Sequence, residues 1–479
     1  MKARLGKVLN ALGASLWFVP SLLALAAAAV SLGLIELDRR IEPQTLGIAS
    51  LLFHGGPEGA RAVLSALVSS MMTVTGVTFS VTVVALTLAS QQYTPRLLRH
   101  FAADRVNQIV LGTFIGTFVY CLLVLRTVRS ENAAGAAGPF VPQIAVTGGV
   151  VLAIASLALL IYFIHHVASA IQPSNIISSL AQSTHELIDH LFPEQMGEEA
   201  TVHEAREEGL PDSMGAGGLP IPAAETGYLQ AVDVEALLRL AGEKSLLVRM
   251  ERAIGDFVPR GATLATAWPQ PSRDNRQRDE QGGEHDRELA RRINRCFAFG
   301  CDRTMQQDPE YGVIQLSDIA VKALSPGIND PTTALTCLDF LGTLLRHMAA
   351  REMPSPLRKD EEGRLRVITR GTDFGRMTDL ALSSIRHYGE SSAPVTLRLL
   401  QTLREVAVVL PPGSDREEVL RCHLREIAAG AERGISSSAK RAQIEQALRR
   451  AEESVLGVAP GAAEPAAVPD NGRHGPLVP

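Results

Sequence analysis

Four long apolar runs without a charged residue constrain the fold of this chain more than any other feature. They cover residues 15–35, 62–90, 106–125 and 143–164. Each approaches or exceeds the about 20 residues that a helix needs to cross a bilayer. A cleaved signal peptide is the alternative for the first run, but this run is long for the apolar region of such a peptide. We therefore predict an α-helical membrane protein with about four transmembrane helices within residues 1–167.

The chain changes character beyond residue 167, where charged residues become frequent. Residues 168–226 predict an amphipathic helix and an acidic, flexible linker. Alternating apolar residues predict a small β subdomain over 227–268. Helical patterns dominate 287–456, with candidates near 287–306, 313–324, 331–350, 373–388, 393–410, 415–433 and 437–456. The Pro/Ala/Gly-rich tail 457–479 is predicted to be disordered. The predicted architecture is a membrane bundle followed by a mixed β-then-α cytosolic region.

The side of the membrane on which the C-terminal half lies is not decided by positive charge. With the N-terminus inside, the inner segments carry Lys2, Arg4, Lys7, Arg96, Arg99 and Arg105, and the outer loops carry Arg39, Arg40, Arg61, Arg126 and Arg129. This balance is nearly even under the positive-inside rule. The five cysteines form no disulfide framework, which favours a reducing compartment. We expect a multi-pass protein of the bacterial inner (plasma) membrane with a cytoplasmic C-terminal half.

The second apolar run carries a row of small and hydroxyl residues. On a helix they advance by three, four or seven positions and share one face, opposite a face of valines; they are Ser65, Ser69, Thr73, Gly76, Ser80, Thr87 and Ser90. One interpretation is close helix packing, supported by the pair Gly112 and Gly116 in the third run. The other is a wet path for an ion or small polar solute between several subunits. The absence of Asp, Glu, Lys and Arg from the runs argues against a proton-driven transporter more than against a passive pore.

The sequence ALSPGINDPTTA, residues 323–334, is the most distinctive polar motif of the C-terminal half. Ser325 begins a helix-breaking Ser-Pro-Gly triplet, and Asn329 is suited to a turn. Asp330 followed by Pro331 predicts a helix N-cap with proline at the first helical position. The alternative is an anion or lipid headgroup bound by the free amides of the first turn, including that of Thr333, although Asp330 would repel an anion.

No other pattern predicts an enzyme or a cofactor site. Arg303, Asp308, Asp318 and Asp330 could converge, but ordinary helix-end ion pairs are the simpler interpretation. The histidine pairs 165/166 and 185/190 lack the tight ligand grouping of a structural zinc site. GDFVPRGATLA is similar to a turn of a lipoyl-type module, but Lys244 lacks the hairpin context of a modified lysine. Nucleophile elbows, phosphate loops and basic nucleic-acid-binding blocks are also missing from the sequence. We expect neither catalysis nor a metal, cofactor or nucleic-acid partner.

Three long motifs together resemble a known family. They are MMTVTGVTFSVTVVALTLASQQYTPRLL, LGTFIGTFVYCLLVLR and SDIAVKALSPGINDPTTA. They resemble the uncharacterised bacterial membrane-protein family known as domain of unknown function 2254, from the first apolar run to about residue 410. The resemblance implies an inner-membrane protein with a cytoplasmic C-terminal half, and it brings neither an assigned activity nor site residues.

The residues themselves therefore support two functional hypotheses. The first is a homo-oligomeric pore or solute pathway lined by the second span and gated or supported by the C-terminal half. The second is a membrane-anchored scaffold or sensor, without transport activity, in which the hydroxyl face only packs helices. The expected partners are the lipid bilayer, further copies of the chain and, for the pore, a small solute or ion.

Overall fold

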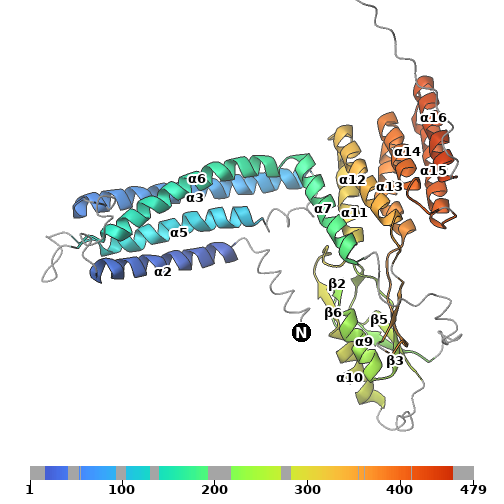
Figure 1. The fold of residues 1–479 in the computed structure, drawn as a ribbon, viewed down its shortest axis with the longest axis horizontal. Coiled ribbons are helices and arrows are strands. Elements are labelled where there is room, and N and C mark those ends of the chain that lie inside the picture. Colours follow the sequence, from blue (N-terminus) through green and yellow to red (C-terminus); the bar gives the residue numbers. More distant parts are fainter. Residues whose placement is uncertain are drawn as a thin grey trace, which may run out of the picture.

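The computed structural model of the 479-residue chain describes residues 17–40, 53, 55–92, 104–129, 140–191, 217–270, 282–353, 355–360, 362–411 and 413–456. Figure 1 shows two parts: an elongated bundle of helices from the first third of the chain, and a C-terminal half in which sheets and further helices lie side by side. The predicted tail 457–479 and most of the predicted linker lie outside the described residues.

Four helices of the bundle are long and apolar enough to cross a membrane. They are α2 (Phe18–Arg40), α3 (Pro57–Gln92), α5 (Arg105–Thr127) and α6 (Gln143–Ala170). Helix α5 lies at the centre, with Val110, Phe114, Tyr120 and Val124 buried along its length. The Tyr120 hydroxyl donates a hydrogen bond of 2.8 Å to the carbonyl of Ala145, so α5 and α6 are held together by a polar contact as well as by packing.

The first span extends beyond the predicted run 15–35 and includes two carboxylates, Glu36 and Asp38, of which only Asp38 is buried. Asp38 is buried against the start of α6, where it accepts hydrogen bonds from the amides of Ile144 (3.0 Å) and Ala145 (2.9 Å). The N-cap residue of α6 is Pro142, which makes no side-chain cap. Asp38 therefore satisfies free amides of a helix start from a neighbouring helix, and its negative charge complements the helix dipole.

The glycine pair of the third span lies at the contact between α5 and α2. A Cβ at Gly112 would lie 2.6 Å from Leu23 Cδ1 and 2.9 Å from the Cα of Pro20. A Cβ at Gly116 would lie 3.3 Å from the Cβ of Ala27. Any side chain at Gly112 would push the helices apart, so these glycines permit the close approach that small residues allow between membrane helices.

Helix α7 (Pro173–Leu191) follows α6 after two residues and enters the C-terminal half. Its apolar side chains recur at helical spacing and are buried; with Thr184 they are Ile177, Leu180, Ala181 and Ile188. This face packs against α11 (Pro309–Ala323) and α12 (Pro331–Ala349), and Figure 1 shows α7 between the bundle and these helices. The last membrane-type helix is thereby connected to the main core of the C-terminal half.

Two sheets form the lower part of the C-terminal half in Figure 1. The first has the order β1 (Leu219–Pro222), β5 (Thr263–Pro269), β3 (Leu246–Met250), β8 (Leu365–Ile368) and β7 (Leu357–Lys359). The second has the order β4 (Phe257–Val258), β2 (Gly227–Val232) and β6 (Phe297–Gly300), and α9 (Val234–Glu243) and α10 (Gly282–Asn294) pack on the strands.

The β region differs from the prediction in four places. Strand β1 lies within the predicted linker 168–226, and helix α9 lies within the predicted β subdomain 227–268. The predicted helix 287–306 is α10 followed by strand β6. Strands β7 and β8 were not predicted. They return to the first sheet after α10, β6, α11 and α12, and β8 pairs parallel with β3. Both strands are only three or four residues long, so their pattern is too short to be recognised locally. The order of elements is accordingly not a simple β-then-α series.

Six helices build the remaining part around one apolar core. After α11 and α12 they are α13 (Phe374–Gly389), α14 (Ala393–Ala407), α15 (Arg416–Gly434) and α16 (Ser438–Val455). Five of the seven predicted helices match α12 to α16 within a few residues, and the one near 313–324 corresponds to α11, which begins four residues earlier at Pro309. Proline stands in the first turn of α11, α12 and α14, where its missing amide costs no helical hydrogen bond.

Candidate functional site

The hydroxyl face of α3 lies on the outside of the bundle. Six residues of the predicted face are exposed along the helix; they are Ser65, Ser69, Thr73, Gly76, Ser80 and Thr87. The side chain of the seventh, Ser90, lies outside the described residues. The buried positions of α3 form a different stripe with a mostly seven-residue spacing; they are Ala60, Leu64, Met71, Thr78 and Ala85. The predicted hydroxyl face is therefore not the surface by which α3 packs within its own chain.

Several threonines on α3 bond back to their own helix. Thr73 Oγ1 donates to the Ser69 carbonyl at 3.0 Å, and Thr87 Oγ1 donates to the Val83 carbonyl at 2.9 Å. A hydroxyl proton used in this way leaves the oxygen lone pairs available to accept a hydrogen bond. The face can therefore meet another helix or water.

The cavity that adjoins α3 inside the bundle is mostly apolar. It has a volume of about 120 Å³ and lies between α3, α5 and α6. Thr82 and Asn107 are its polar lining residues, among side chains such as Phe79, Leu111 and Val167. A polar solute would gain little from such walls, so this cavity does not form a polar path within one subunit.

The motif at 325–333 forms the turn between α11 and α12. Asn329 adopts a left-handed conformation with φ of 50°, and its amide donates to the Ser325 carbonyl at 2.9 Å. Asp330 is the N-cap of α12, and its carboxylate accepts from the amide and the hydroxyl of Thr333 at 3.1 and 2.5 Å. The Thr333 hydroxyl and the amides of the first turn hold the pKa of Asp330 below its usual value. Helix initiation, as predicted, accounts for Asp330 and Pro331.

The four charged residues considered for a common site do not converge. Asp318 lies about 15 Å along α11 from Asp308, and Asp330 lies at the opposite end of that helix, where its amide donates to the Ala323 carbonyl. Arg303 and Asp308 do meet. The Asp308 carboxylate accepts two hydrogen bonds from the Arg303 guanidinium, at 2.6 and 3.0 Å.

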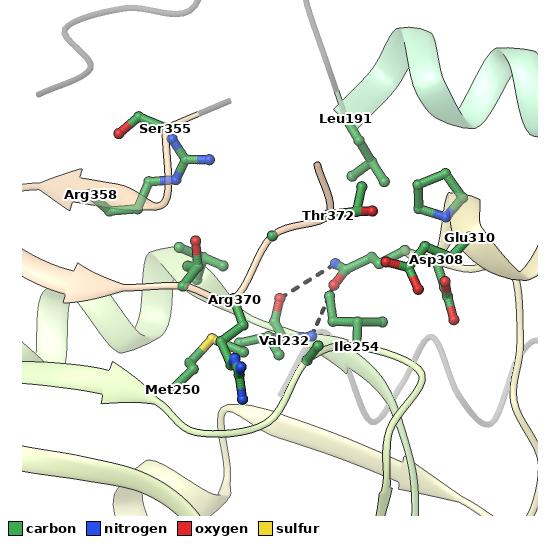
Figure 2. Close-up of a pocket in the computed structure, with 16 residues that line it drawn as sticks. Leu191, Val232, Met250, Ile254, Asp308, Glu310, Ser355, Arg358, Arg370 and Thr372 are labelled. Carbon is green, nitrogen blue, oxygen red and sulfur yellow. Dashed lines mark hydrogen bonds between the residues drawn. The ribbon is translucent and has the colours of Figure 1, made fainter. Parts of the chain in front are cut away.

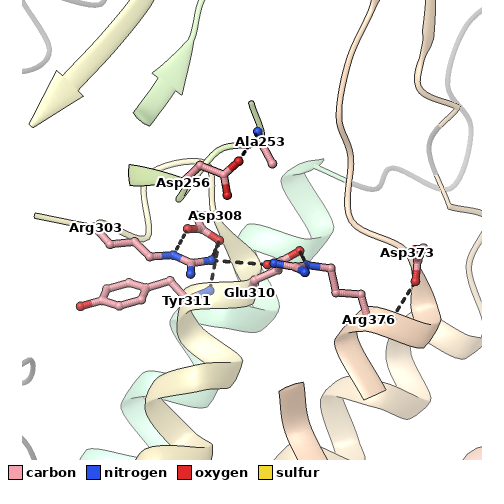
Figure 3. A network of polar contacts seen from close by, with 8 residues as sticks. All are labelled: Ala253, Asp256, Arg303, Asp308, Glu310, Tyr311, Asp373 and Arg376. Carbon is pink, nitrogen blue, oxygen red and sulfur yellow. Dashed lines mark hydrogen bonds and ion pairs between the residues drawn. The ribbon is translucent and has the colours of Figure 1, made fainter. Parts of the chain in front are cut away.

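A larger network surrounds this pair, as Figure 3 shows. Glu310 Oε1 accepts from Arg376 of α13 at 2.7 Å, and Glu310 Oε2 lies 3.5 Å from Arg303. Asp308 is also the N-cap of α11, accepting from the Tyr311 amide. Burial raises the pKa of Asp308, whereas Arg303 and the Tyr311 amide act in the opposite direction. The network joins the start of α11 to the start of α13.

The loop between β3 and β4 is fitted to the same pair. Gly255 in this loop has a φ of +91°, and a Cβ there would lie 2.4 Å from Asp308 Oδ2 and 2.6 Å from Arg303 Nε. Its neighbour Asp256 is held by a hydrogen bond from the Ala253 amide at 2.9 Å. Only glycine fits both the conformation and the contact, so the sheets and the helices meet at this point.

A pocket of about 220 Å³ lies beside this network, where the sheets meet the helical part (Figure 2). Apolar side chains line part of the pocket, including those of Leu191 at the end of α7, Met250 and Ile254. Polar groups line the remainder; they are Gln307, Asp308, Glu310, Ser355, Arg358, Thr369, Arg370 and Thr372. The mixture suits a small molecule with an apolar body and one charged or polar end.

The polar lining of the pocket is fixed by its own hydrogen bonds. Gln307 Oε1 accepts from the Val232 amide at 2.9 Å, which ties the residues before α11 to the end of strand β2. Arg370 donates to the Glu251 carbonyl at 3.0 Å. Although burial alone would raise the pKa of the Glu251 carboxyl, hydrogen bonds from Thr266 and Arg249 and the charge of Arg370 lower it. The Arg370 guanidinium thus faces a carboxylate that stays ionised at neutral pH.

The C-terminal half also contains a side-chain cluster that the sequence did not reveal. His185 and Asp189 of α7 meet His347 of α12, and the three could hold a metal ion. Sequence reasoning found only histidines 185 and 190, because His347 lies 158 residues from Asp189. The spacing of His185 and Asp189, four residues apart on one helix face, was the available signal.

Comparison with known proteins identifies the family. The family model described as a predicted membrane protein, DUF2254, matches residues 13–405. The chain belongs to this family. Uncharacterized proteins of Mycobacterium bovis and Mycobacterium tuberculosis are each 34% identical to it over 451 residues, which are 94% of this chain and 82% of the relative. No solved structure matches the chain. The resemblance predicted from the three motifs is confirmed.

Proposed function

We propose that this DUF2254 protein is a homo-oligomeric membrane protein in which α3 of neighbouring subunits lines a pathway for a small polar solute or ion. The observation that carries the proposal is the exposed hydroxyl face of α3, which includes Ser69, Thr73 and Ser80 and is not used for packing within the chain. A row of polar groups on the outside of a membrane helix is better placed against another polar surface or water than against lipid tails. The proposal assigns no catalytic step.

The pathway is tested by cysteine labelling of the full-length protein in membranes. Single cysteines replace Ser69, Thr73, Ser80 or Thr87, after Cys121, Cys301 and Cys422 are changed to serine. Val81 and Leu88, 42% and 41% exposed and about 100–120° around the helix from Ser69 and Thr87, give the controls. A water-filled pathway should let a small, membrane-impermeant thiol reagent label the hydroxyl set and spare the two controls, because only a hydrated thiol ionises readily.

The second hypothesis, a membrane-anchored scaffold or sensor, is favoured by a different observation. The pocket of about 220 Å³ between the sheets and the helical part, which we call the junction pocket, is lined by Leu191, the last residue of α7. Helix α7 follows α6 after only two residues. A ligand in the pocket would therefore touch the helix that connects it to the bundle. In this case the α3 hydroxyl face only packs subunits together, and Gly76→Leu should separate the oligomer. Absence of labelling at all four hydroxyl positions, with loss of assembly in Gly76→Leu, would refute the pathway and favour the scaffold or sensor.

The proposed orientation places the C-terminal half in the cytoplasm of a bacterial inner membrane. With all four membrane-type helices crossing the bilayer, as we propose, the C-terminal half lies on the same side as the N-terminus. The unpaired thiols of Cys296, Cys301, Cys337 and Cys422 fit a reducing compartment. A reporter that works only in the cytoplasm should be active when fused after residue 457, and a reporter that requires export should be silent. The reverse result would refute the orientation.

A further inference from the structure

Three potential metal ligands converge where α7 meets α12. Asp189 is the centre of the cluster. Its Oδ1 atom lies 2.7 Å from His347 Nε2, and its Oδ2 atom lies 3.1 Å from His185 Nδ1. One ligand atom from each residue lies within 4.8 Å of the other two.

The geometry of the two imidazoles is suited to a shared ion. Their ring centroids lie 3.9 Å apart with an interplanar angle of 23°, so the rings of His185 and His347 are stacked and each turns a nitrogen toward Asp189. His347 Nε2 shares a hydrogen bond with the Asp189 carboxylate, and His185 Nδ1 lies at ion-pair distance from its other oxygen. An imidazole nitrogen without a proton has a lone pair directed toward Asp189. A cation can therefore bind between the two imidazole nitrogens and the carboxylate.

The surroundings of the cluster permit metal entry. The side chains of His185, Asp189 and His347 are 39%, 41% and 22% exposed, so solvent reaches the ligand atoms. Arg351, one turn beyond His347, contacts Asp189 Oδ1 at 2.6 Å. Oδ2 can therefore bind a metal while Arg351 stays on Oδ1 as an outer partner of the ligating carboxylate. The positive charge of Arg351 lowers the affinity for a cation without blocking that oxygen.

We infer that His185, Asp189 and His347 form a binding site for a divalent transition-metal ion such as Zn²⁺, which ties α7 to α12. Two imidazoles and one carboxylate match the ligand preferences of zinc and its neighbours, and three protein ligands leave a fourth position for water. The site lies outside the α3 face and the junction pocket, so it stands independently of the proposed function. It bridges the helix that follows the membrane bundle and a helix of the main C-terminal core.

The test uses the full-length protein in detergent, purified with a tag that contains no histidine and stripped of metal with a chelator. Co²⁺ is titrated as a spectroscopic substitute for Zn²⁺, and its visible absorption reports coordination by protein ligands. The expected result is saturable binding of one Co²⁺ per chain, reversed by Zn²⁺. His185→Ala and His347→Gln should each weaken the affinity at least about tenfold, since even outer-shell changes cost metal sites this much.

Two variants keep the result interpretable. His190→Ala removes an exposed imidazole on the same helix, next to Asp189 but outside the cluster, and should bind Co²⁺ like the wild type. His347→Gln keeps a side-chain amide that can donate to Asp189, so its gel-filtration profile should match the wild type while metal affinity falls. Failure of the wild type to bind Co²⁺, or unchanged affinity in both His185→Ala and His347→Gln, would overturn the inference.

Discussion

The contact between α7 and α11 gives the sharpest stability prediction, because it depends on a single glycine. A Cβ added at Gly312 would lie 2.1 Å from Thr184 Oγ1, 2.9 Å from Thr184 Cγ2 and 3.0 Å from Thr184 Cβ. Non-bonded carbon atoms prefer about 3.5–4.0 Å. Thr184 is fully buried, and its hydroxyl already donates to the Leu180 carbonyl at 2.7 Å. Gly312→Ala must therefore move α7 away from α11.

The expected magnitude follows from two opposing effects. Overpacking a core contact costs about 1–3 kcal/mol. Replacing glycine by alanine within a helix contributes about 1 kcal/mol of stability. Gly312→Ala should thus be destabilising by about 1 kcal/mol. Thr184→Ala loses a buried methyl group and the hydroxyl that donates to Leu180, for which we expect a destabilisation of about 1–2 kcal/mol. In the double variant the new methyl group at 312 occupies the space vacated at 184. The double variant should therefore be less destabilised than the sum of the two single variants by at least about 1 kcal/mol.

Urea unfolding of the full chain in detergent measures these differences. The chain has two tryptophans, and Trp17→Phe leaves the buried Trp268 as the fluorescent reporter of the C-terminal half. Far-UV circular dichroism should give a coincident transition if unfolding of this half is two-state. Strictly additive single and double variants would refute the close contact between α7 and α11. A stabilised Gly312→Ala would refute it as well.

Three further predictions concern other local contacts. Gly255→Ala should lower the free energy of unfolding by about 2 kcal/mol or more, because it combines a left-handed backbone with a clash. Gly261→Ala, with φ of +85° and open space, should lower it by about 1 kcal/mol in the same urea assay. Asp330→Ala should cost about 0.5–2 kcal/mol and Asp330→Ser should largely restore stability; equal losses in both would refute the cap as the source of the effect. Burial lowers the pKa of His423 below its usual 6.5, so the unfolded chain is protonated more readily. Stability should therefore fall as pH drops below about 6.5, by up to about 1.4 kcal/mol per pH unit, and His423→Gln should flatten this dependence.

The sequence by itself determined the features that depend on local patterns. Uncharged apolar runs specify membrane-type helices, because length and hydropathy alone decide whether a segment can cross a bilayer. Asp330 before Pro331 specified a helix start, since an N-cap and its first turn are neighbours in the chain. Strands β2 and β3 were visible in their alternating residues. The hydroxyl face of α3 was also visible in the sequence, because residues three, four or seven positions apart lie on one side of a helix.

The tertiary structure decided which of these faces meet and what lies between them. It put the α3 hydroxyl face on the outside of the bundle, although the same spacing would suit a buried face. It brought β8 beside β3 and fitted Gly255 against Arg303 and Asp308. It also placed His347 against Asp189, 158 residues away. Such contacts depend on how whole helices and sheets pack, and the packing is set by the combined burial of many side chains. A local sequence pattern shows which residues share one face of a helix or strand. Only the packed structure determines which element that face contacts.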